Sequence, residues 1–366
     1  MSGAPTAASS GNHSLHLPTP TLDAESQSLL QSISAQGGYA YARMAALAVA
    51  GDQSAAEAAR DMAWEQLHSG PWHSVLPVWR DAYSMACLHV AKFHFAAGEF
   101  GEALGALDMG LIMGGTLLRK DLHDSVLLVS SEARKKAKSL GDFKGEKLVP
   151  EVPVDVNEVL KILPLRSLTS GRVDKRSDLS MEGFLRDYFQ TGTPVVITNC
   201  MAHWPARTKW NHLDYLTSVA GNRTVPVEVG KNYLCSDWKQ ELVTFSKFLE
   251  RMRTNRSTSV EPTYLAQHPL FDQVVGKKYI RLYPSSLQDE LYPYSETMLC
   301  NSSQVDLDNI DKNEFPKAVE LEFMDCILEE GEMLYIPPKW WHYVRSLTMS
   351  FSVSFWWSNE AESSDS

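Results

Sequence analysis

The chain has 366 residues, 44% hydrophobic and 22% charged, and its 34 Lys and Arg against 45 Asp and Glu give a formal net charge of −11. This length accommodates two domains of ordinary size, each with its own core, and the composition is that of a soluble globular protein. The negative charge argues against broad binding to nucleic-acid backbones, so we expect no direct nucleic-acid contact. The one basic cluster, Arg134 to Lys138, lies in a predicted helix, where it favours a solvated helix face over a nuclear-import signal.

The first twenty residues have no apolar core, and no later stretch approaches eighteen apolar residues. Neither a signal peptide nor a membrane anchor is therefore expected. The five cysteines are scattered without a Cys-x-x-Cys pair, which favours thiols in a reducing compartment. We expect the protein in the nucleus and cytoplasm, with a protein substrate or a protein partner.

The first part of the chain has a helical composition. Residues 1–22 are small, polar and proline-containing, and we expect them to be disordered. Residues 23–140 are rich in Ala, Leu, Met and Glu, and from Trp79 to Leu118 apolar residues recur at three- and four-residue spacing, as in a pair of amphipathic helices. Ala91 to Leu104 has the small residues and turn glycine of a tetratricopeptide hairpin. We predict an all-α helical, repeat-like domain that serves docking or scaffolding.

The second part of the chain is predicted to be rich in strands. Residues 141–180 form a charged linker with one predicted strand at Val159–Leu163, and residues 181–357 form the second domain before a disordered tail at 358–366. A short helix is predicted at Met181–Gln190 and another near Trp210–Ala220. Strands are predicted at Thr193–Ile197, Val225–Val229, Tyr279–Tyr283, Cys326–Leu328, Met333–Ile336 and Ser350–Trp356. This spacing is typical of a β-sandwich or jelly-roll barrel.

Several segments of the second part form a pattern that is specific to one family. Gly331–Val344 indicates a strand, a turn fixed by two prolines, and a histidine that opens the next strand, and Ser350–Trp357 indicates a half-buried strand with aromatic residues. Upstream lie Tyr264–His268 and Gly276–Tyr283. Together with the strands at 193–197 and 225–229, these segments resemble the JmjC family of Fe(II)- and 2-oxoglutarate-dependent oxygenases. The resemblance covers roughly residues 24–357.

The resemblance implies an α+β protein, with the helical domain followed by a JmjC double-stranded β-helix of the jelly-roll or cupin type. It implies two cofactors, Fe(II) and 2-oxoglutarate, with iron held by two histidines and one carboxylate on one face. The implied reaction is hydroxylation or demethylation of arginine or lysine side chains in proteins, which is typical of chromatin regulators.

The resemblance also assigns roles to five residues. His342 matches the distal iron-binding histidine, Lys278 the lysine that pairs with a 2-oxoglutarate carboxylate, and Tyr264 a tyrosine that donates to the same carboxylate. Trp356 matches an aromatic residue of the pocket, and Glu228 a strand acid that receives a basic substrate side chain. Core packing stays open as the alternative role of Tyr264 and Trp356, and a solvent-facing strand charge as that of Glu228.

One part of the family pattern is missing. The family's other two iron ligands come as His-x-Asp on a strand between the tyrosine and lysine segments, where this chain has only the nine residues from His268 to Gly276, without that motif. In the proteins that it resembles, several dozen residues lie there. The only His-x-Asp of the chain, His212-Leu-Asp214, lies in a predicted helix before the Val225 strand. We therefore predict an internal deletion near residues 273–276 and an incomplete iron site.

Three functions stay open. An oxygenase of protein side chains needs the complete iron site, a non-catalytic adaptor or decoy would act through the helical domain, and a cupin-type carboxylate-binding protein would use Lys278 and Tyr264 without iron. The missing ligands favour the adaptor for this chain. Loss of adjacent strands also predicts a poorly stable second domain, in which Ile280 and Leu282 lack strand partners.

Overall fold

The computed structural model describes residues 15–137, 156–169, 171–204, 209–210, 212–230, 238–254, 263–265, 276–295, 299–348, 350, 352 and 354–355. The chain divides into two compact units, the first formed by Met1–Lys144 with Leu216–His268 and the second by Gly145–Tyr215 with Pro269–Ser366. The first unit therefore combines the helical part with strands from the second half of the sequence.

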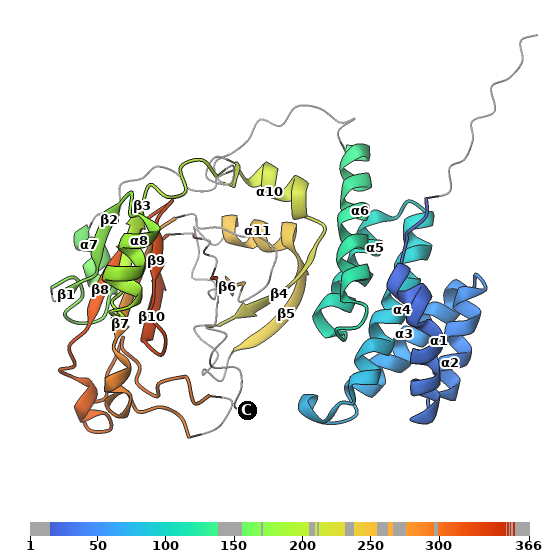
Figure 1. The fold of residues 1–366 in the computed structure, drawn as a ribbon, viewed down its shortest axis with the longest axis horizontal. Coiled ribbons are helices and arrows are strands. Elements are labelled where there is room, and N and C mark those ends of the chain that lie inside the picture. Colours follow the sequence, from blue (N-terminus) through green and yellow to red (C-terminus); the bar gives the residue numbers. More distant parts are fainter. Residues whose placement is uncertain are drawn as a thin grey trace, which may run out of the picture. The chain divides into compact units, whose positions relative to one another are not determined.

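The helical part of the first unit is built from antiparallel helices joined by short turns (Figure 1). They are α1 (Pro20–Ala35), α2 (Tyr39–Val49), α3 (Gln53–Leu67), α4 (Pro77–Ala96), α5 (Phe100–Met113) and α6 (Arg119–Ala137), with a 3₁₀ turn at Trp72–Ser74. The pair predicted between Trp79 and Leu118 is confirmed as α4 and α5. None of the helices in the described ranges has the length and hydropathy to cross a bilayer.

Helix α4 forms the centre of this helical part. The ten consecutive residues from Ala82 to Ala91 are all buried, because α4 packs against α1, α3 and α5. Proline at its first position supplies the fixed φ that a helix start accepts. The Tyr41 hydroxyl of α2 donates to the carbonyl oxygen of Ala82. A helix that is apolar on all sides is stable only inside a bundle, so the neighbouring helices are required for its formation.

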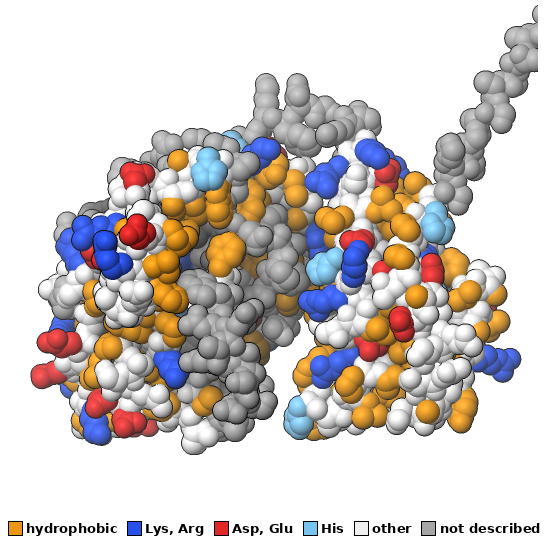
Figure 2. Space-filling view, in the orientation of Figure 1, with side chains coloured by type: hydrophobic (Ala, Val, Ile, Leu, Met, Phe, Trp, Pro, Cys, Tyr) orange, Lys and Arg blue, Asp and Glu red, His pale blue; other side chains and the backbone are white. Residues whose placement is uncertain are grey.

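The basic residues at the end of α6 have partners within the chain. Lys135 forms an ion pair with Glu132, Arg134 donates to the Ser130 carbonyl oxygen, and the Lys136 ammonium lies 5.5 Å from the centre of the Phe100 ring. In the space-filling view, Lys and Arg side chains on the visible face of the helical part are interspersed with Asp and Glu (Figure 2). These contacts are those of a solvated helix face.

The first unit also contains a three-stranded antiparallel sheet in the order β5-β4-β6. The strands are β4 (Thr224–Val229), β5 (Lys239–Thr244) and β6 (Thr263–Tyr264). The same part of the chain contains the helices α10 (Leu213–Ala220), which the unit boundary crosses, and α11 (Phe245–Thr254). Val225, Val227 and Val229 alternate with less buried residues along β4. The predicted strand Val225–Val229 and the helix before it are thus confirmed.

A buried ion pair joins helix α5 to the start of β4. Asp108 of α5 is 1% exposed. Its carboxylate accepts a hydrogen bond from Nε of Arg223 at 2.7 Å and another from the Thr224 amide at 2.6 Å, and Nη2 of Arg223 lies 2.7 Å from Oδ1 as an ion-pair contact. Burial raises the pKa of the Asp108 carboxyl to about 6, although Arg223 and the Thr224 amide lower it. The helical part therefore holds β4 through a carboxylate that has no access to solvent.

The second unit consists of two sheets, in the orders β1-β8-β7-β10 and β2-β3-β9. The strands are β1 (Gly171–Arg172), β2 (Asp174–Ser177), β3 (Val195–Thr198), β7 (Lys278–Tyr283), β8 (Met324–Leu328), β9 (Met333–Tyr335) and β10 (Trp341–Ser346). The other elements are α7 (Val156–Ile162), α8 (Met181–Phe184), a π-helical turn (Leu185–Phe189) and 3₁₀ turns at Ser285–Leu287, Asp289–Leu291 and Pro316–Ala318.

The two sheets of the second unit face each other across one hydrophobic cluster. Val196 of β3 shares this cluster with Ile280 and Leu282 of β7 and Leu328 of β8. We call the side of β7, β8 and β10 that faces this cluster the interior face. Two sheets that enclose a common core form the expected jelly roll, so the predicted α+β fold, helical and then cupin-like, is confirmed.

Two sequence-based expectations for this unit were wrong. Residues 159–162 of the strand predicted at Val159–Leu163 form the end of helix α7, and Leu163 follows it directly. The buried residues Val159 and Leu163 are four positions apart, which is the spacing of one helix face. Ile280 and Leu282 do not lack strand partners, because β7 pairs antiparallel with β8 on one side and β10 on the other. Both partner strands follow β7 in the sequence, so the predicted deletion near residues 273–276 would not remove them.

The side of β7 opposite the interior face carries a buried polar network. Arg281, 3% exposed, donates to the Tyr279 hydroxyl at 2.9 Å, the Leu165 carbonyl oxygen at 2.9 Å and the Ser167 hydroxyl at 2.8 Å. Its guanidinium also lies 3.8 Å from the centre of the Phe323 ring. The network fastens residues 164–168 to the sheet.

Replacing Arg281 by lysine should destabilise the second unit by about 2 kcal/mol, because a single ammonium cannot reproduce three directed hydrogen bonds and the stacking on Phe323. Hydrogen exchange of the β7 amides measures the loss. The matched control is Arg345→Lys, at a partly exposed ion pair with Asp308, which we expect to cost less than about 1 kcal/mol. Equal effects of the two substitutions would contradict the role of the network.

Candidate functional site

Lys278 and His342 lie on the interior face of the second unit. In the antiparallel ladder, Lys278 of β7 stands opposite Ser346 of β10, and Leu282 of β7 stands opposite His342. Opposed residues share a face, so Lys278 and His342 point to the same side. Four ladder positions separate them, or ~13 Å along the strands.

Lys278 is a buried cation without a carboxylate partner among the described residues. It is 5% exposed, and its ammonium donates to the hydroxyl of Ser352. Burial lowers the pKa of Lys278 to about 8. The neighbouring Lys277 differs, since it forms a 2.6 Å ion pair with Glu329 at a partly exposed position. A buried ammonium that lacks a counter-charge suits an incoming carboxylate, such as either end of 2-oxoglutarate.

The depressed pKa of Lys278 predicts a rise of stability with pH. Between about 8 and the ordinary lysine value of 10.5, the folded chain releases this proton while the unfolded chain still holds it, so the unfolding free energy increases through that window. Lys278→Met should remove this increase and should be more stable than the wild type below pH 8. Urea unfolding at pH 7, 8, 9 and 10 tests this, with Lys277→Met as the control. Identical pH profiles of wild type and Lys278→Met would contradict it.

His342 is exposed at the start of β10, directly after the turn that contains Pro337 and Pro338. Among the residues that the structure describes, no three His, Cys, Asp or Glu side chains gather closely enough to hold a metal ion. The His-x-Asp motif was predicted to lie within a helix. Asp214 lies in the first turn of α10, whereas His212 precedes the helix. The described side chains therefore do not fit Fe(II), whereas Lys278 fits a carboxylate.

Glu228 and Tyr264 form a second pair, within the first unit. They stand directly opposite each other on β4 and β6, and burial together with Glu228 raises the pKa of the Tyr264 hydroxyl. The Trp238 indole donates to Glu228 at 3.3 Å. A carboxylate between two aromatic rings suits a basic side chain. The sequence analysis missed Trp238. Trp238 directly precedes β5, and the register in which β5 pairs with β4 beside Glu228 cannot be read from the sequence.

The remaining assignments lie outside the described residues. They are Trp356, His268 and the expected join at 273–275. The strand predicted at Ser350–Trp356 is described only at residues 350, 352, 354 and 355, none of which is in a strand. No structural role is therefore given to Trp356.

Comparison with known families defines the class of protein. Residues 181–273 and 266–363 match the family described as a cupin-like domain, and residues 19–142 match that described as KDM8-like, N-terminal ARM repeats. The repeat-like prediction for the helical domain is confirmed, but its type is ARM, so the tetratricopeptide interpretation was wrong. The fold is thus that of a cupin-like protein with an N-terminal helical repeat domain.

Similar proteins narrow this class. Lysine-specific demethylase JMJ30 of Arabidopsis thaliana is 76% identical over 429 aligned residues, which cover 100% of both chains. Lysine-specific demethylase 8 of Xenopus tropicalis is 30% identical, and Jumonji C domain-containing protein 5 of Drosophila melanogaster is 31% identical. Both alignments cover 81% of this chain, and they cover 87% and 84% of those proteins. The chain therefore belongs to the JmjC family, in the group with KDM8-like N-terminal repeats.

Proposed function

We propose that this chain is a JmjC relative of protein demethylases and hydroxylases that lacks the His-x-Asp part of the iron site and therefore does not turn over 2-oxoglutarate. One observation carries the proposal. The alignment with the Arabidopsis relative runs over 429 positions, and this chain has 366 residues, so 63 or more positions lie opposite a gap in this chain. The two cupin-like matches meet at residues 266–273, where the family's His-x-Asp was expected.

The chemistry of the iron site explains the consequence. The family's iron requires two histidines and a carboxylate on one face, with positions left open for the co-substrate and O₂. This chain offers His342 for one of these positions, and its only His-x-Asp, His212-Leu-Asp214, spans the N-terminal end of helix α10 instead of lying on a strand. Loss of an outer partner alone costs roughly 10- to 100-fold in metal affinity. Loss of two direct ligands should leave Fe(II) unbound at cellular concentrations.

Two features, one in each unit, support binding without turnover. In the second unit, Lys278 offers a buried ammonium to a carboxylate. In the first unit, Glu228 with Tyr264 and Trp238 offers a surface for a basic side chain. The relatives from Arabidopsis thaliana and Xenopus tropicalis are named as lysine-specific demethylases. We infer that the family reaction is demethylation or hydroxylation of lysine or arginine side chains in proteins, and that this chain binds such a side chain without modifying it.

The test compares the chain with the Arabidopsis relative, each at equal concentration. Thermal unfolding is measured with 2-oxoglutarate alone, with Mn(II) alone as a redox-inert replacement for Fe(II), and with both. Succinate formation with Fe(II) is measured in parallel. We expect a joint Mn(II) and 2-oxoglutarate shift, and succinate, for the relative only. A joint shift or succinate formation by this chain would overturn the proposal.

A second candidate function is a non-catalytic adaptor that acts through the helical part. It is favoured by the match of residues 19–142 to the KDM8-like repeats and by the complete hydrophobic core of helices α1 to α6. An adaptor should compete with the Arabidopsis relative for its protein partners, and surface substitutions on the helical part should abolish this competition. Competition that depends on Glu228 alone would instead place the binding surface on the sheet.

A further inference from the structure

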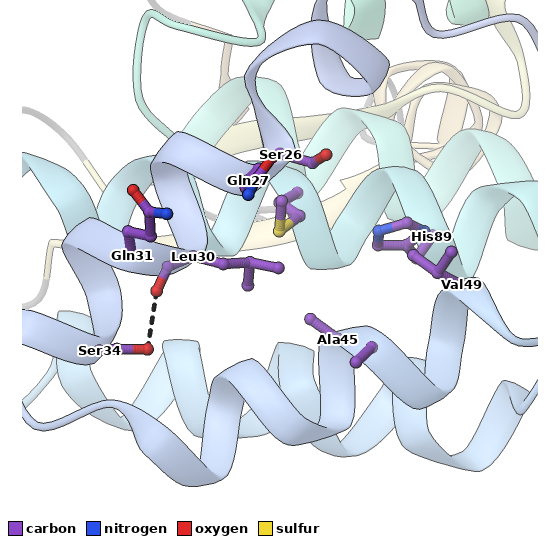
Figure 3. Close-up of a pocket in the computed structure, with 10 residues that line it drawn as sticks. Ser26, Gln27, Leu30, Gln31, Ser34, Ala45, Val49 and His89 are labelled. Atoms are coloured by element: carbon purple, nitrogen blue, oxygen red, sulfur yellow. Dashed lines mark hydrogen bonds between the residues drawn. The ribbon is translucent and has the colours of Figure 1, made fainter.

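A pocket of about 600 Å³ opens between helices α1, α2 and α4, far along the sequence from the cupin-like domain. Figure 3 shows Leu30 of α1 above Ala45 of α2, with His89 of α4 beside Val49 at one end. This volume is within the range of small-molecule sites. The walls are formed by Leu30, Ala45, Val49 and Met85, and polar side chains from α1 include Gln27 and Gln31.

One ring nitrogen of the buried residue His89 has no hydrogen-bond partner among the described residues. The residue is 7% exposed, and the nitrogen without a partner is Nε2. A buried nitrogen without a hydrogen-bond partner destabilises the folded chain, and His89 lies within the run of buried residues of α4. A hydrogen bond from a bound molecule would satisfy this nitrogen.

The pocket carries no charge. None of its ten lining residues is Asp, Glu, Lys or Arg. Burial and Lys92 lower the pKa of His89 to about 4, and Asp23 raises it only in part, so the imidazole is neutral near pH 7. Asp23 and Lys92 themselves stand 4.0 Å apart as a surface ion pair. A charged ligand would find no counter-charge among the lining residues, so the pocket selects uncharged molecules.

We propose that this pocket binds a free, uncharged, largely apolar small molecule with one hydroxyl group, which forms a hydrogen bond with Nε2 of His89. A hydroxyl group both donates and accepts, so it matches Nε2 in either tautomer of the imidazole. The apolar part of the ligand packs on Leu30, Val49 and Met85. The helical part then carries a ligand site of its own, separate from the Lys278 and His342 face.

The experiment titrates the full chain with para-propylphenol and with propylbenzene, which lacks only the hydroxyl group. Amide and imidazole chemical shifts in the helical part report the binding. We expect the phenol to shift the resonances of Leu30, Ala45 and His89 and to bind about tenfold more tightly than propylbenzene. His89→Phe should make the two affinities equal. His94→Phe is the matched control, because His94 is on the same helix but pairs with Glu99 outside the pocket.

A second pair of variants tests the pocket without a substitution at the buried residue His89. Ala46 lines the pocket and is exposed, so Ala46→Trp should block it without disturbing the core, whereas Leu47→Trp at the neighbouring exposed position should not. The proposal is overturned if neither probe shifts the pocket resonances, or if both probes bind the wild type equally. It is also overturned if Ala46→Trp and Leu47→Trp bind the phenol equally well.

Discussion

Under the proposed function, insertion of the Arabidopsis JMJ30 residues that lie opposite the gap is expected to confer 2-oxoglutarate turnover on this chain. The inserted residues are placed at the join near residues 273–276. At 76% identity, the surrounding strands should accept this segment. Because the insertion would return the His-x-Asp pair next to His342, succinate formation should rise by at least about a hundredfold. The measurement is succinate per chain under saturating Fe(II) and 2-oxoglutarate.

Two substitutions in the chimera identify the source of the gain. His342→Ala should return succinate formation to background, because it removes the third ligand. Lys278→Met should mainly raise the KM for 2-oxoglutarate, because it removes the buried ammonium that we propose as the partner of the carboxylate. If the unmodified chain formed succinate as fast as the chimera, its iron would have to be held by other residues, and the proposed loss of function would be wrong.

The secondary structure that the sequence predicted well is the part fixed by local periodicity. Apolar residues at three- and four-residue spacing gave α4 and α5, and runs of β-branched residues gave β3 and β4. The prediction of a strand at Val159–Leu163 was wrong, because a short apolar run fits a strand and a buried helix segment equally. The repeat type failed for a related reason, since ARM and tetratricopeptide hairpins share small residues and turn glycines.

The site was predicted by resemblance and not by geometry. The sequence alone could not show that Lys278 is buried while Lys277 forms an ion pair with Glu329, because the two residues are adjacent and chemically identical. The register between β7 and β10 decides this difference. Contacts between distant parts of the chain were missed altogether. Asp108 and Arg223 are 115 positions apart, and neither stands out from other charged residues in the sequence.

Replacement of Asp108 by alanine is expected to cost about 3 to 5 kcal/mol of unfolding free energy in the first unit. The substitution removes one hydrogen bond from Arg223, one from the Thr224 amide and the ion pair with Arg223. It leaves the Arg223 side chain, which is 17% exposed, without this carboxylate. Breaking one side of a buried pair has an effect of this size. Hydrogen exchange of the β4 amides should show the loss first, because β4 begins at the lost contact.

The double variant Asp108→Leu with Arg223→Leu distinguishes the ion pair from mere packing. If the cost arises from an uncompensated buried charge, the double variant should be more stable than either single variant, since both charges leave together. Asp61→Ala is the control, because Asp61 pairs with Arg60 at the surface with its side chain 71% exposed, and it should change stability by less than about 1 kcal/mol. Additive losses in the double variant would contradict coupling between α5 and β4. Non-additive losses would show that the carboxylate of α5 and the guanidinium at the start of β4 stabilise the first unit as a pair.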